Sequence, residues 1–433
     1  MKTVIIIANS FPPINTISVC RYLSMARYLP EFGWKVIVVT PDWTLINRTE
    51  LEKKIGAIPN DSQSVFSAWD PQFTPDDGMR VERVPFRSRD DIGENKLKRI
   101  WSKCRAHYYD YLLGDLPREM LKRVRKICQY EDVDAILSSG VPEYLFRIPN
   151  TLFREQEIPW IADYRDLVDQ NPIEAADWRS YSRQWLARKV FIFRNSLLVR
   201  SASARVIVSE RLVDKLYSRN SIPVQVIMNG FDPVDFPYFD KSLAPCNKKL
   251  TISYGGTIYP YQRPALFLEG LVLFLKKTPE ARGTIQVQFF GQSCDFIRNS
   301  IPLELDSDTV SLQGNIPRPE LLNRLCKSDI LLFLSVQSKW IPAKIFEYLA
   351  SKRPILSVPG DRDITDEILS ASNIGKGAET AEEISCILEH WFIEWQDKGS
   401  ISIEPNMSEI SKYSRKSQTK QLSRLLNSVT GDQ

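Results

Sequence analysis

The chain has 433 residues, of which 43% are hydrophobic and 25% are charged, and its formal net charge is +4. Domains usually contain about 100–200 residues, so a chain of this length is expected to form two or three of them. The ordinary composition excludes a disordered or collagen-like chain, and the small net charge argues against a nucleic-acid-binding protein.

The first half of the chain alternates short apolar segments with longer periodic ones. Strands are predicted at residues 3–8, 35–40, 134–138, 160–163, 206–209 and 224–228. Helices are predicted near 16–32, 118–130, 142–156, 175–196 and 210–217. Segment 47–80 is rich in turn formers and is predicted to be mostly loop. Short β-branched strands separated by helices are typical of a parallel, doubly wound sheet.

The alternation of strands and helices is interrupted near residue 231 and continues in the second half of the chain. Segment 231–247 carries three prolines and no periodicity, which is typical of an interdomain linker. Strands follow at 249–254, 284–290, 330–335 and 354–358, with helices at 264–277, 320–326, 343–350 and, outside the alternation, 411–429. We therefore predict an α/β protein with two facing doubly wound, Rossmann-like domains. The ranges are an N-terminal domain at 1–235, a linker at 236–248, a C-terminal domain at 249–405 and a helical segment at 406–433.

The positions of the histidines and cysteines limit the kinds of metal site and disulfide that the chain can form. The two histidines, His107 and His390, lie far apart in the sequence, which argues against a histidine-based metal site, although carboxylates are still able to hold Mg²⁺. The seven cysteines include no Cys-x-x-Cys pair, so buried thiols in a reducing compartment are favoured. No stretch approaches the roughly 18 apolar residues that span a bilayer. We expect a cytoplasmic protein without a metal or cofactor.

The loop after the first strand of the second half is a candidate anion site. Ligands of open α/β sheets bind at the carboxyl ends of the strands. Gly255 and Gly256 allow a ligand to approach the backbone closely, and Arg263 stands beside the start of the next predicted helix. A plain strand-to-helix turn with a surface arginine fits the same residues, because a Gly-Gly pair is a weak signal.

A second candidate follows the apolar strand at 330–335. Lys344 and Glu347 are three residues apart on a predicted helix, so they share one face. They would form a surface ion pair, or Lys344 would face a phosphate while Glu347 accepts hydrogen bonds from ribose hydroxyls.

Two strand ends in the first half also carry polar residues. Asp163, Arg165 and Asp166 follow one predicted strand, and Gly140 follows another. These residues are either a structural charge cluster or part of a cleft floor.

Several segments, in this order, resemble retaining glycosyltransferases of family 4, which have the GT-B architecture, and the resemblance spans nearly the whole chain. The segments are 11–13 (Phe-Pro-Pro) with Arg21, 29–34 (Leu-Pro-Glu-Phe-Gly-Trp), 163–166 (Asp-Tyr-Arg-Asp), 228–232 (Met-Asn-Gly-Phe-Asp), 256–259 (Gly-Thr-Ile-Tyr) with Arg263 and Pro264, 344–350 (Lys-Ile-Phe-Glu-Tyr-Leu-Ala) with 354–356 (Pro-Ile-Leu), and 413–415 (Tyr-Ser-Arg). The resemblance implies that the C-terminal helix crosses back to the N-terminal domain.

The resemblance also implies a function. A sugar would move from a nucleotide-diphosphate sugar, which is a substrate and not a cofactor, to a glycan or lipid-linked acceptor in bacterial surface polysaccharide biosynthesis. Arg263 and Lys344 would stabilise the departing diphosphate in place of a metal. The donor would contact Gly256, Thr257, Arg263, Lys344, Ile345 and Glu347. The acceptor would contact residues near Asn15, Gly140, Asp163 and Asp166.

The sequence departs from the family pattern in the donor region. Lys339 stands where many members have a glutamate that contacts the donor sugar, so the sugar is not indicated. Thr257 and Gln262 replace the usual Arg and Lys of the phosphate loop. Two alternatives therefore stay open: a non-catalytic nucleotide-sugar-binding partner, and another GT-B enzyme such as a sugar-nucleotide epimerase. The nucleotide base, the acceptor and any general base are not indicated either.

A basic, aromatic segment at 96–126 bears on the partners. It interleaves ten Lys and Arg residues with Trp101 and three tyrosines. Such a segment predicts peripheral contact with an anionic membrane at the inner face of the cytoplasmic membrane, although a solvated helix face would have the same composition.

Overall fold

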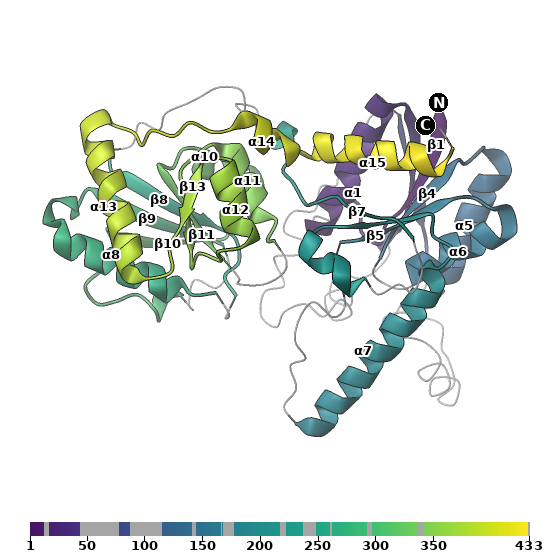
Figure 1. The fold of residues 1–433 in the computed structure, drawn as a ribbon, viewed down its shortest axis with the longest axis horizontal. Coiled ribbons are helices and arrows are strands. Elements are labelled where there is room, and N and C mark those ends of the chain that lie inside the picture. Colours follow the sequence, from purple (N-terminus) through teal and green to yellow (C-terminus); the bar gives the residue numbers. More distant parts are fainter. Residues whose placement is uncertain are drawn as a thin grey trace. The chain divides into compact units, whose positions relative to one another are not determined.

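The computed structural model describes residues 1–12, 17–43, 78–86, 115–140, 144–165, 167, 177–216, 222–236, 248–259, 262–291, 297–335 and 341–431. The chain divides into two compact units (Figure 1). Unit 1 comprises Met1–Met228 and Gln418–Gln433, and unit 2 comprises Asn229–Ser417. The sequence analysis placed the first boundary at residue 235. Residues 47–77 of the predicted loop lie outside the described part of the chain.

Unit 1 is built on a parallel sheet with the strand order β3-β2-β1-β4-β5-β6-β7. In the register, Ile5 of β1 stands beside Ile37 of β2 and Ile136 of β4. The order reverses between β1 and β4, as in other doubly wound sheets. The strands are β1 (Lys2–Ile7), β2 (Trp34–Pro41), β3 (Met79–Val84), β4 (Ala135–Ser139), β5 (Trp160–Tyr164), β6 (Ala204–Ile207) and β7 (Val224–Val226).

Helices cover both faces of this sheet because its strands are apolar on both faces. Ile5 and Ile7 point into a cluster with α5, α6 and the end of α7, whereas Val4 and Ile6 point into a cluster with α1 and α15. The helices are α1 (Ile17–Tyr28), η1 (Leu29–Phe32), α5 (Leu116–Tyr130), α6 (Tyr144–Gln156), α7 (Trp178–Val199), η3 (Glu210–Lys215) and α15 (Arg415–Val429).

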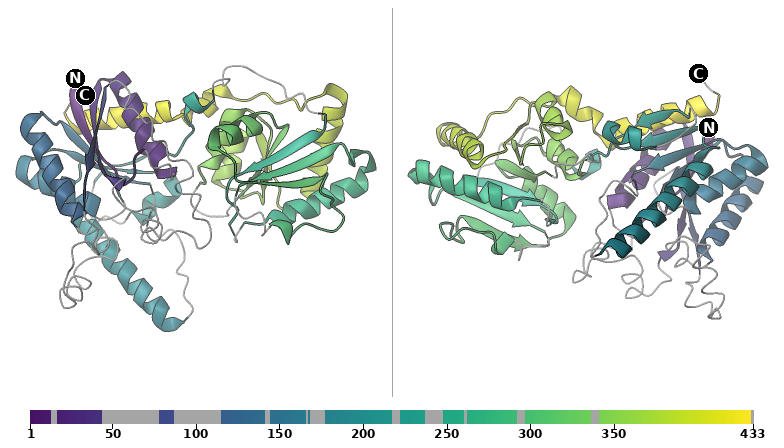
Figure 2. Two further views of the ribbon diagram at one scale, coloured as in Figure 1. Left: turned by 180° about the vertical axis from the view of Figure 1, so that it is seen from behind. Right: turned by 60° about the horizontal axis from the view of Figure 1, so that its bottom comes forward.

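The C-terminal helix α15 completes the core of unit 1. Leu422 and Leu426 are fully buried in the cluster that contains Val4 and Ile6 of the first strand. Figure 2 shows this helix, in yellow, against the strands near the N-terminus. The expectation that the terminal helix returns to the N-terminal domain is therefore confirmed.

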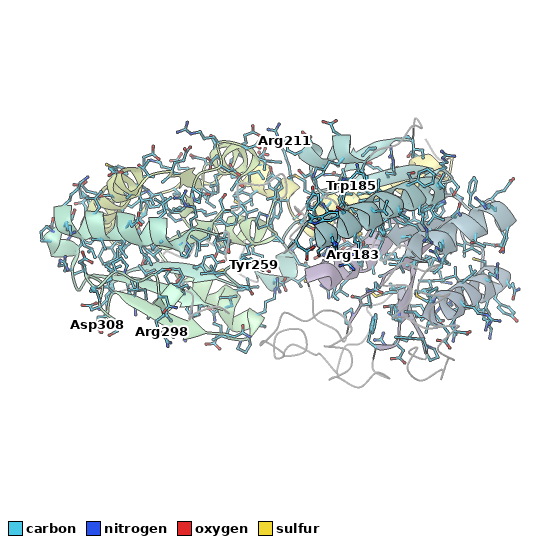
Figure 3. The ribbon with its side chains drawn as sticks, turned by 90° about the horizontal axis from the view of Figure 1, so that it is seen from below. Arg183, Trp185, Arg211, Tyr259, Arg298 and Asp308 are labelled. Carbon is cyan, nitrogen blue, oxygen red and sulfur yellow. The ribbon has the colours of Figure 1, made fainter. Side chains whose placement is uncertain are left out.

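Helix α7 is held by its C-terminal half only. Phe191, Asn195 and Val199 are buried, and the side-chain oxygen of Asn195 accepts a 2.8 Å hydrogen bond from the Tyr164 hydroxyl. The preceding turns are exposed, and Figure 3 labels Arg183 and Trp185 on this part of the helix.

Unit 2 contains a second parallel sheet, with the strand order β10-β9-β8-β11-β12-β13. Its order reverses between β8 and β11, where Ile252 pairs with Ile330. The strands are β8 (Leu250–Gly255), β9 (Ile285–Phe290), β10 (Val310–Gly314), β11 (Ile330–Leu334), β12 (Ile355–Val358) and β13 (Gly375–Gly377). The predicted pair of doubly wound parallel sheets is thus confirmed.

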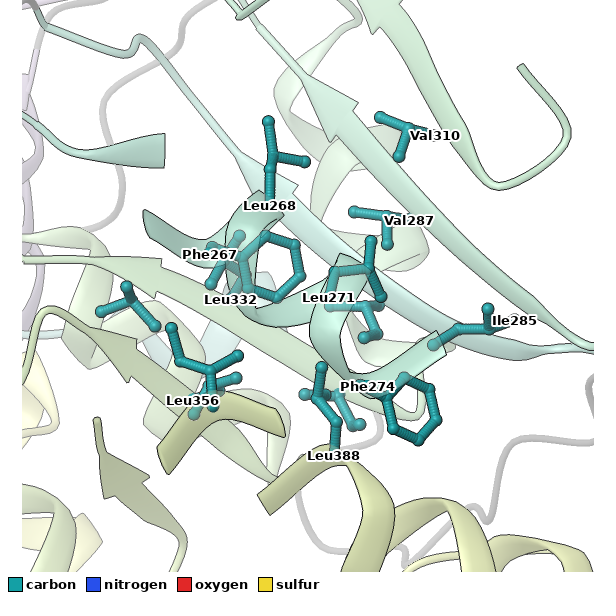
Figure 4. Packing of buried hydrophobic residues seen from close by; sticks show 14 of the residues in the cluster. Phe267, Leu268, Leu271, Phe274, Ile285, Val287, Val310, Leu332, Leu356 and Leu388 are labelled. Carbon is teal, nitrogen blue, oxygen red and sulfur yellow. The ribbon is translucent and has the colours of Figure 1, made fainter. Parts of the chain in front are cut away.

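Alternating side chains of the second sheet contact helices on opposite faces. Leu332 and Leu334 pack with α8 and α13, as the close view in Figure 4 shows for Leu332. Phe333 points the other way and contacts the ring of Tyr348 in α11. The helices are η4 (Pro233–Asp235), α8 (Pro264–Lys277), η5 (Pro279–Ala281), α10 (Arg318–Cys326), α11 (Lys344–Ser351), α12 (Ile364–Ala371), α13 (Ala381–Lys398) and α14 (Met407–Lys412).

The burial of α15 generates a stability prediction. We expect Leu426→Ala to lower the free energy of unfolding by about 2–5 kcal/mol, because it leaves a cavity in the core of unit 1. Urea unfolding of the full chain measures the effect. Arg424→Ala is the matched control, since Arg424 is exposed on the same helix. Equal stability of the two variants would contradict the packing described above.

Candidate functional site

The candidate site lies at the carboxyl ends of β8 and β11 in unit 2. These neighbouring strands flank the point at which the strand order reverses, which is where open α/β sheets bind ligands. The loop after β8 leads to α8, and α11 begins with Lys344. The structure therefore brings together Gly256, Thr257 and Lys344, which the sequence analysis had assigned to separate segments.

Lys344 is half-buried, and its ammonium group lies beneath the loop that follows β8. Its Nζ donates hydrogen bonds to the Tyr254 hydroxyl at 2.6 Å and to the Thr257 carbonyl oxygen at 2.9 Å. It also lies 4.6 Å from the centroid of the Tyr254 ring. Burial lowers the pKa of Lys344 from 10.5 to about 7, and the charge of Glu347 opposes this shift. The site thus holds an amine that is close to its titration point at neutral pH.

The glycine at position 256 makes room for this amine. Gly256 has a φ of +111°, and a Cβ atom built there would lie 2.6 Å from Lys344 Cε and 2.8 Å from Nζ. At Gly291, which follows β9, an added Cβ would lie 2.4 Å from the Gly256 carbonyl oxygen. Both positions therefore need glycine, because side chains would displace the loop or the lysine.

Two side chains fix the loop from below. The Tyr348 hydroxyl accepts a 2.9 Å hydrogen bond from the Gly255 N–H. Gln262 is buried; its Nε2 donates to the Leu334 carbonyl oxygen at 2.6 Å and its Oε1 accepts from the Tyr259 N–H at 2.9 Å. Gln262, which stands where the family has a basic residue, thus connects the loop to the end of β11.

Arg263 and Glu347 occupy different environments. Arg263 precedes the first residue of α8 and is exposed, and it forms no ion pair with a described residue. Glu347 accepts a 2.7 Å hydrogen bond from the guanidinium of Arg318, and the same nitrogen donates to Asp235 at 2.9 Å. Within the described part of the chain, Glu347 therefore pairs with Arg318 instead of Lys344.

Arg318 is the residue that sequence reasoning missed. It is the first residue of α10, whose helical periodicity was predicted from residue 320. The preceding strand β10 was not predicted, so the loop after it was not considered as a site. A signal was nevertheless present, because Arg318-Pro319 repeats the Arg-Pro pair of Arg263-Pro264 at the start of a helix.

Ile345 lies between Lys344 and Glu347 in the sequence, but its side chain points into the core of unit 2. Its side chain is fully buried in unit 2, and its N–H donates a 3.2 Å hydrogen bond to the Pro342 carbonyl oxygen. Its side chain therefore supports α11 from within the core.

The candidates in unit 1 surround a buried ion pair. Arg21 binds the Asp163 carboxylate through two hydrogen bonds of 2.9 and 2.8 Å, and both side chains are at most 2% exposed. Arg21 also donates to the carbonyl oxygens of Ile227 and Met228, each at 3.1 Å. The Gly140 N–H donates to the Asp163 carbonyl oxygen at 2.9 Å.

These contacts place Asp163 inside unit 1, at the point where the chain leaves it. Asn15, Asp166 and Lys339 lie outside the described residues.

Two of the family-like segments meet in unit 2. Phe231 forms a bridge with Ser414, and its carbonyl oxygen accepts a 2.8 Å hydrogen bond from the Arg415 N–H. The Tyr413 ring contacts Phe346 of α11 at a centroid distance of 5.4 Å. The segments near 229–232 and 413–415 therefore lie side by side, next to the helix that carries Lys344.

Only residues 115–126 of the basic segment at 96–126 are described. There Lys122 pairs with Glu119, Arg123 with Glu82, and Arg125 with Glu155. None of the helices described is both long and apolar enough to cross a bilayer. Within the same residues, no group of three or more His, Cys, Asp and Glu side chains is placed to hold a metal ion.

The fold is shared with solved structures, although the sequence matches no family model and no curated protein. The chain is similar to sucrose-phosphate synthase from Thermosynechococcus elongatus, with a TM-score of 0.57, 12% identity and coverage of 99% of both chains. It is similar to HepE from Anabaena in complex with UDP-glucose, with a TM-score of 0.56, 12% identity and coverage of 99% of this chain and 100% of that one. A glycosyltransferase from Rickettsia africae gives a TM-score of 0.56 at 12% identity, with coverage of 100% and 99%. The chain therefore has the GT-B fold.

The depressed pKa of Lys344 predicts a pH dependence of stability. The unfolded chain binds this proton up to about pH 10.5 and the folded chain up to about pH 7, so the Lys344 contribution becomes more favourable as pH rises between these values. We expect Lys344→Met to stabilise the protein most at pH 6, with a gain that shrinks toward pH 9. Urea unfolding of both proteins at several pH values measures this difference, and a constant gain would contradict the assigned pKa.

Proposed function

We propose that the protein is a retaining glycosyltransferase that transfers a sugar from a nucleotide-diphosphate sugar to a glycan or lipid-linked acceptor. The observation that carries the proposal is the half-buried, hydrogen-bonded Lys344 at the switch point of the second sheet of a GT-B fold. Structures with this fold include HepE bound to UDP-glucose and the pneumococcal transferase GtfA bound to UDP and GlcNAc. We therefore propose a uridine nucleotide as the first donor to test.

The reaction requires stabilisation of negative charge. The bond between the anomeric carbon and the diphosphate oxygen breaks, a bond to the acceptor hydroxyl oxygen forms, and the hydroxyl proton passes to the departing diphosphate, on which negative charge accumulates. Fixed cations aimed at this charge favour the transition state over the ground state. Lys344 lies beside the carbonyl of Thr257, and the exposed Arg263 begins the helix that follows this loop. These two cations would perform the role without a metal.

Because the pKa of Lys344 is lowered, binding of the donor would change the protonation of this lysine. Among the described residues, the hydroxyl of Tyr254 and the carbonyl of Thr257 accept hydrogen bonds from the ammonium, and no carboxylate does. A diphosphate placed nearby would raise the pKa of Lys344, because an opposite charge favours the charged form. Donor binding near pH 8 would then be accompanied by proton uptake.

Glu347 would orient the nucleotide. One of its oxygens accepts from Arg318, and its Oε2 accepts no hydrogen bond from a described residue. A carboxylate held in this way suits a ribose diol, with Gly256, Thr257 and the backbone of Ile345 contributing the rest of the donor site. Arg318 would act as a positioning residue, since it pairs with both Asp235 and Glu347 and so holds the Glu347 carboxylate in place.

We place the acceptor on unit 1, near Asn15, Gly140 and Asp166. Asp163 would act through Arg21 and Gly140, because its carboxylate is enclosed. Membership of family 4, a role in surface polysaccharide biosynthesis, and action at the inner face of the cytoplasmic membrane belong to the same proposal. The order of the family-like motifs along the chain supports this proposal.

The cations generate a prediction for turnover. We expect Arg263→Ala and Lys344→Met each to lower kcat at least about tenfold, which corresponds to about 1.4 kcal/mol of activation free energy. Release of UDP from UDP-sugars measures the rate. Lys277→Ala is the control, because it removes an exposed cation from the far end of α8. Full activity in both site variants would contradict the assigned roles.

The proposed function is tested first by nucleotide binding and then by assays for sugar transfer. We expect uridine diphosphate to raise the thermal unfolding temperature of the wild type, and to raise that of Lys344→Met less. Calorimetry at pH 8 in two buffers of different ionisation enthalpy measures the proton uptake. Binding with neither donor hydrolysis nor transfer to any acceptor pool would favour a non-catalytic nucleotide-sugar-binding protein, and interconversion of free nucleotide sugars would favour an epimerase.

A further inference from the structure

The exposed part of α7 carries large apolar side chains that the described residues of unit 1 leave uncovered. Trp178 is 73% exposed, Phe193 is 63% exposed and Leu186 is 58% exposed. These residues belong to two neighbouring stripes at helical spacing. The stripes are Trp178, Tyr181 and Trp185, and Leu186, Val190, Phe193 and Leu197. Large exposed apolar side chains in this number on one helix mark an interaction site.

The charges of the same helix have one sign. The 22 residues of α7 contain five Lys and Arg residues and no Asp or Glu. Two of the cations lie over exposed indole rings: Arg179 is 5.6 Å from the Trp178 ring and Lys189 is 5.7 Å from the Trp185 ring. The partner must therefore present anionic groups next to an apolar layer.

The exposure and position of α7 further limit the kind of partner that it can bind. Between Trp178 and Gln184 every residue except Ser180 is exposed, and Figures 1 and 2 show this end of the helix extending away from the strands of unit 1. Tryptophan and tyrosine combined with Lys and Arg are typical of helices that lie in a membrane interface. A second copy of α7 would bring together cations without a compensating anion. With five cations, α7 is suited to lie on a bilayer and not to cross it.

We propose that α7 is a membrane-docking helix that inserts its Trp178–Leu197 face into the interface of an anionic bilayer. The apolar side chains would enter the boundary between headgroups and acyl chains, while Arg179, Arg183 and Lys189 reach the lipid phosphates. This inference goes beyond the proposed function, because it rests on α7 in unit 1 and not on the donor site in unit 2. It also assigns the membrane contact to a different element from the basic segment at 96–126.

Flotation of the full-length protein with vesicles tests the proposal. We expect binding to vesicles rich in phosphatidylglycerol at about 0.05 M salt, weak binding to pure phosphatidylcholine, and release at about 0.5 M salt. The charge-reversal variant Arg179→Glu/Arg183→Glu/Lys189→Glu should lower the partition coefficient at least about tenfold, since each cation near the surface contributes roughly fivefold. Trp185→Ser/Phe193→Ser should lower it by a similar factor through loss of buried apolar area.

A charge-matched control separates α7 from net charge. Lys277→Glu/Arg282→Glu/Lys376→Glu removes three exposed cations from unit 2 and should bind as tightly as the wild type. Circular dichroism and thermal unfolding check that the variants fold, which their exposed positions favour. Equal loss of binding in both charge-reversal variants would overturn the proposal, as would absence of wild-type binding at low salt. Sedimentation velocity adds a further test, because a dimer abolished by Trp185→Ser/Phe193→Ser would assign α7 to self-association instead.

Discussion

The buried ammonium of Lys344 is the constraint on which the candidate site depends. A charged amine loses its hydration on burial, and that loss has to be offset by hydrogen bonds or by an opposite charge. Here the Tyr254 hydroxyl and the Thr257 carbonyl supply the hydrogen bonds, and Gly256 leaves the space. No carboxylate touches the amine among the described residues. The positive charge of the amine is therefore not balanced by an opposite charge within the described residues, and an anion bound beside it would supply that charge.

Arg21 and Asp163 show the opposite solution to the same problem. Both side chains are almost fully enclosed, and each satisfies the other through two hydrogen bonds. The remaining guanidinium N–H groups bind the carbonyl oxygens of Ile227 and Met228, at the end of unit 1. A buried pair of this kind contributes little net stability but is costly to break, so it fixes the path of the chain. Unit 1 thus uses a buried charge to fix the chain, whereas the Lys344 amine of unit 2 has no carboxylate partner among the described residues.

The sequence predicted the interior strands and one edge strand, β7, and missed the other three edge strands. Interior strands such as β1 and β11 are apolar on both faces, which gives a strong local signal. β3, β10 and β13 are edge strands whose alternate or charged residues, as in Met79–Val84, do not need burial on both sides. For the site, strand ends identified Gly256 and Lys344. The environment of Lys344 depends on Tyr254, which is 90 positions away in the sequence, so a local sequence pattern could not predict it. Arg318 was missed because it follows β10, a strand that was not predicted.

The return of the last helix to the first strand has a consequence for biosynthesis. Unit 2 is continuous in sequence, from Asn229 to Ser417, whereas unit 1 is closed by Gln418–Gln433. A ribosome adds residues in order and then keeps the last few tens of them within its exit tunnel. Unit 2 can therefore complete its core while unit 1 still lacks Leu422 and Leu426. The first unit to be translated is therefore finished after the second, and its apolar face around Val4 and Ile6 stays open until Leu422 and Leu426 have left the tunnel. Until then this face depends on protection from aggregation.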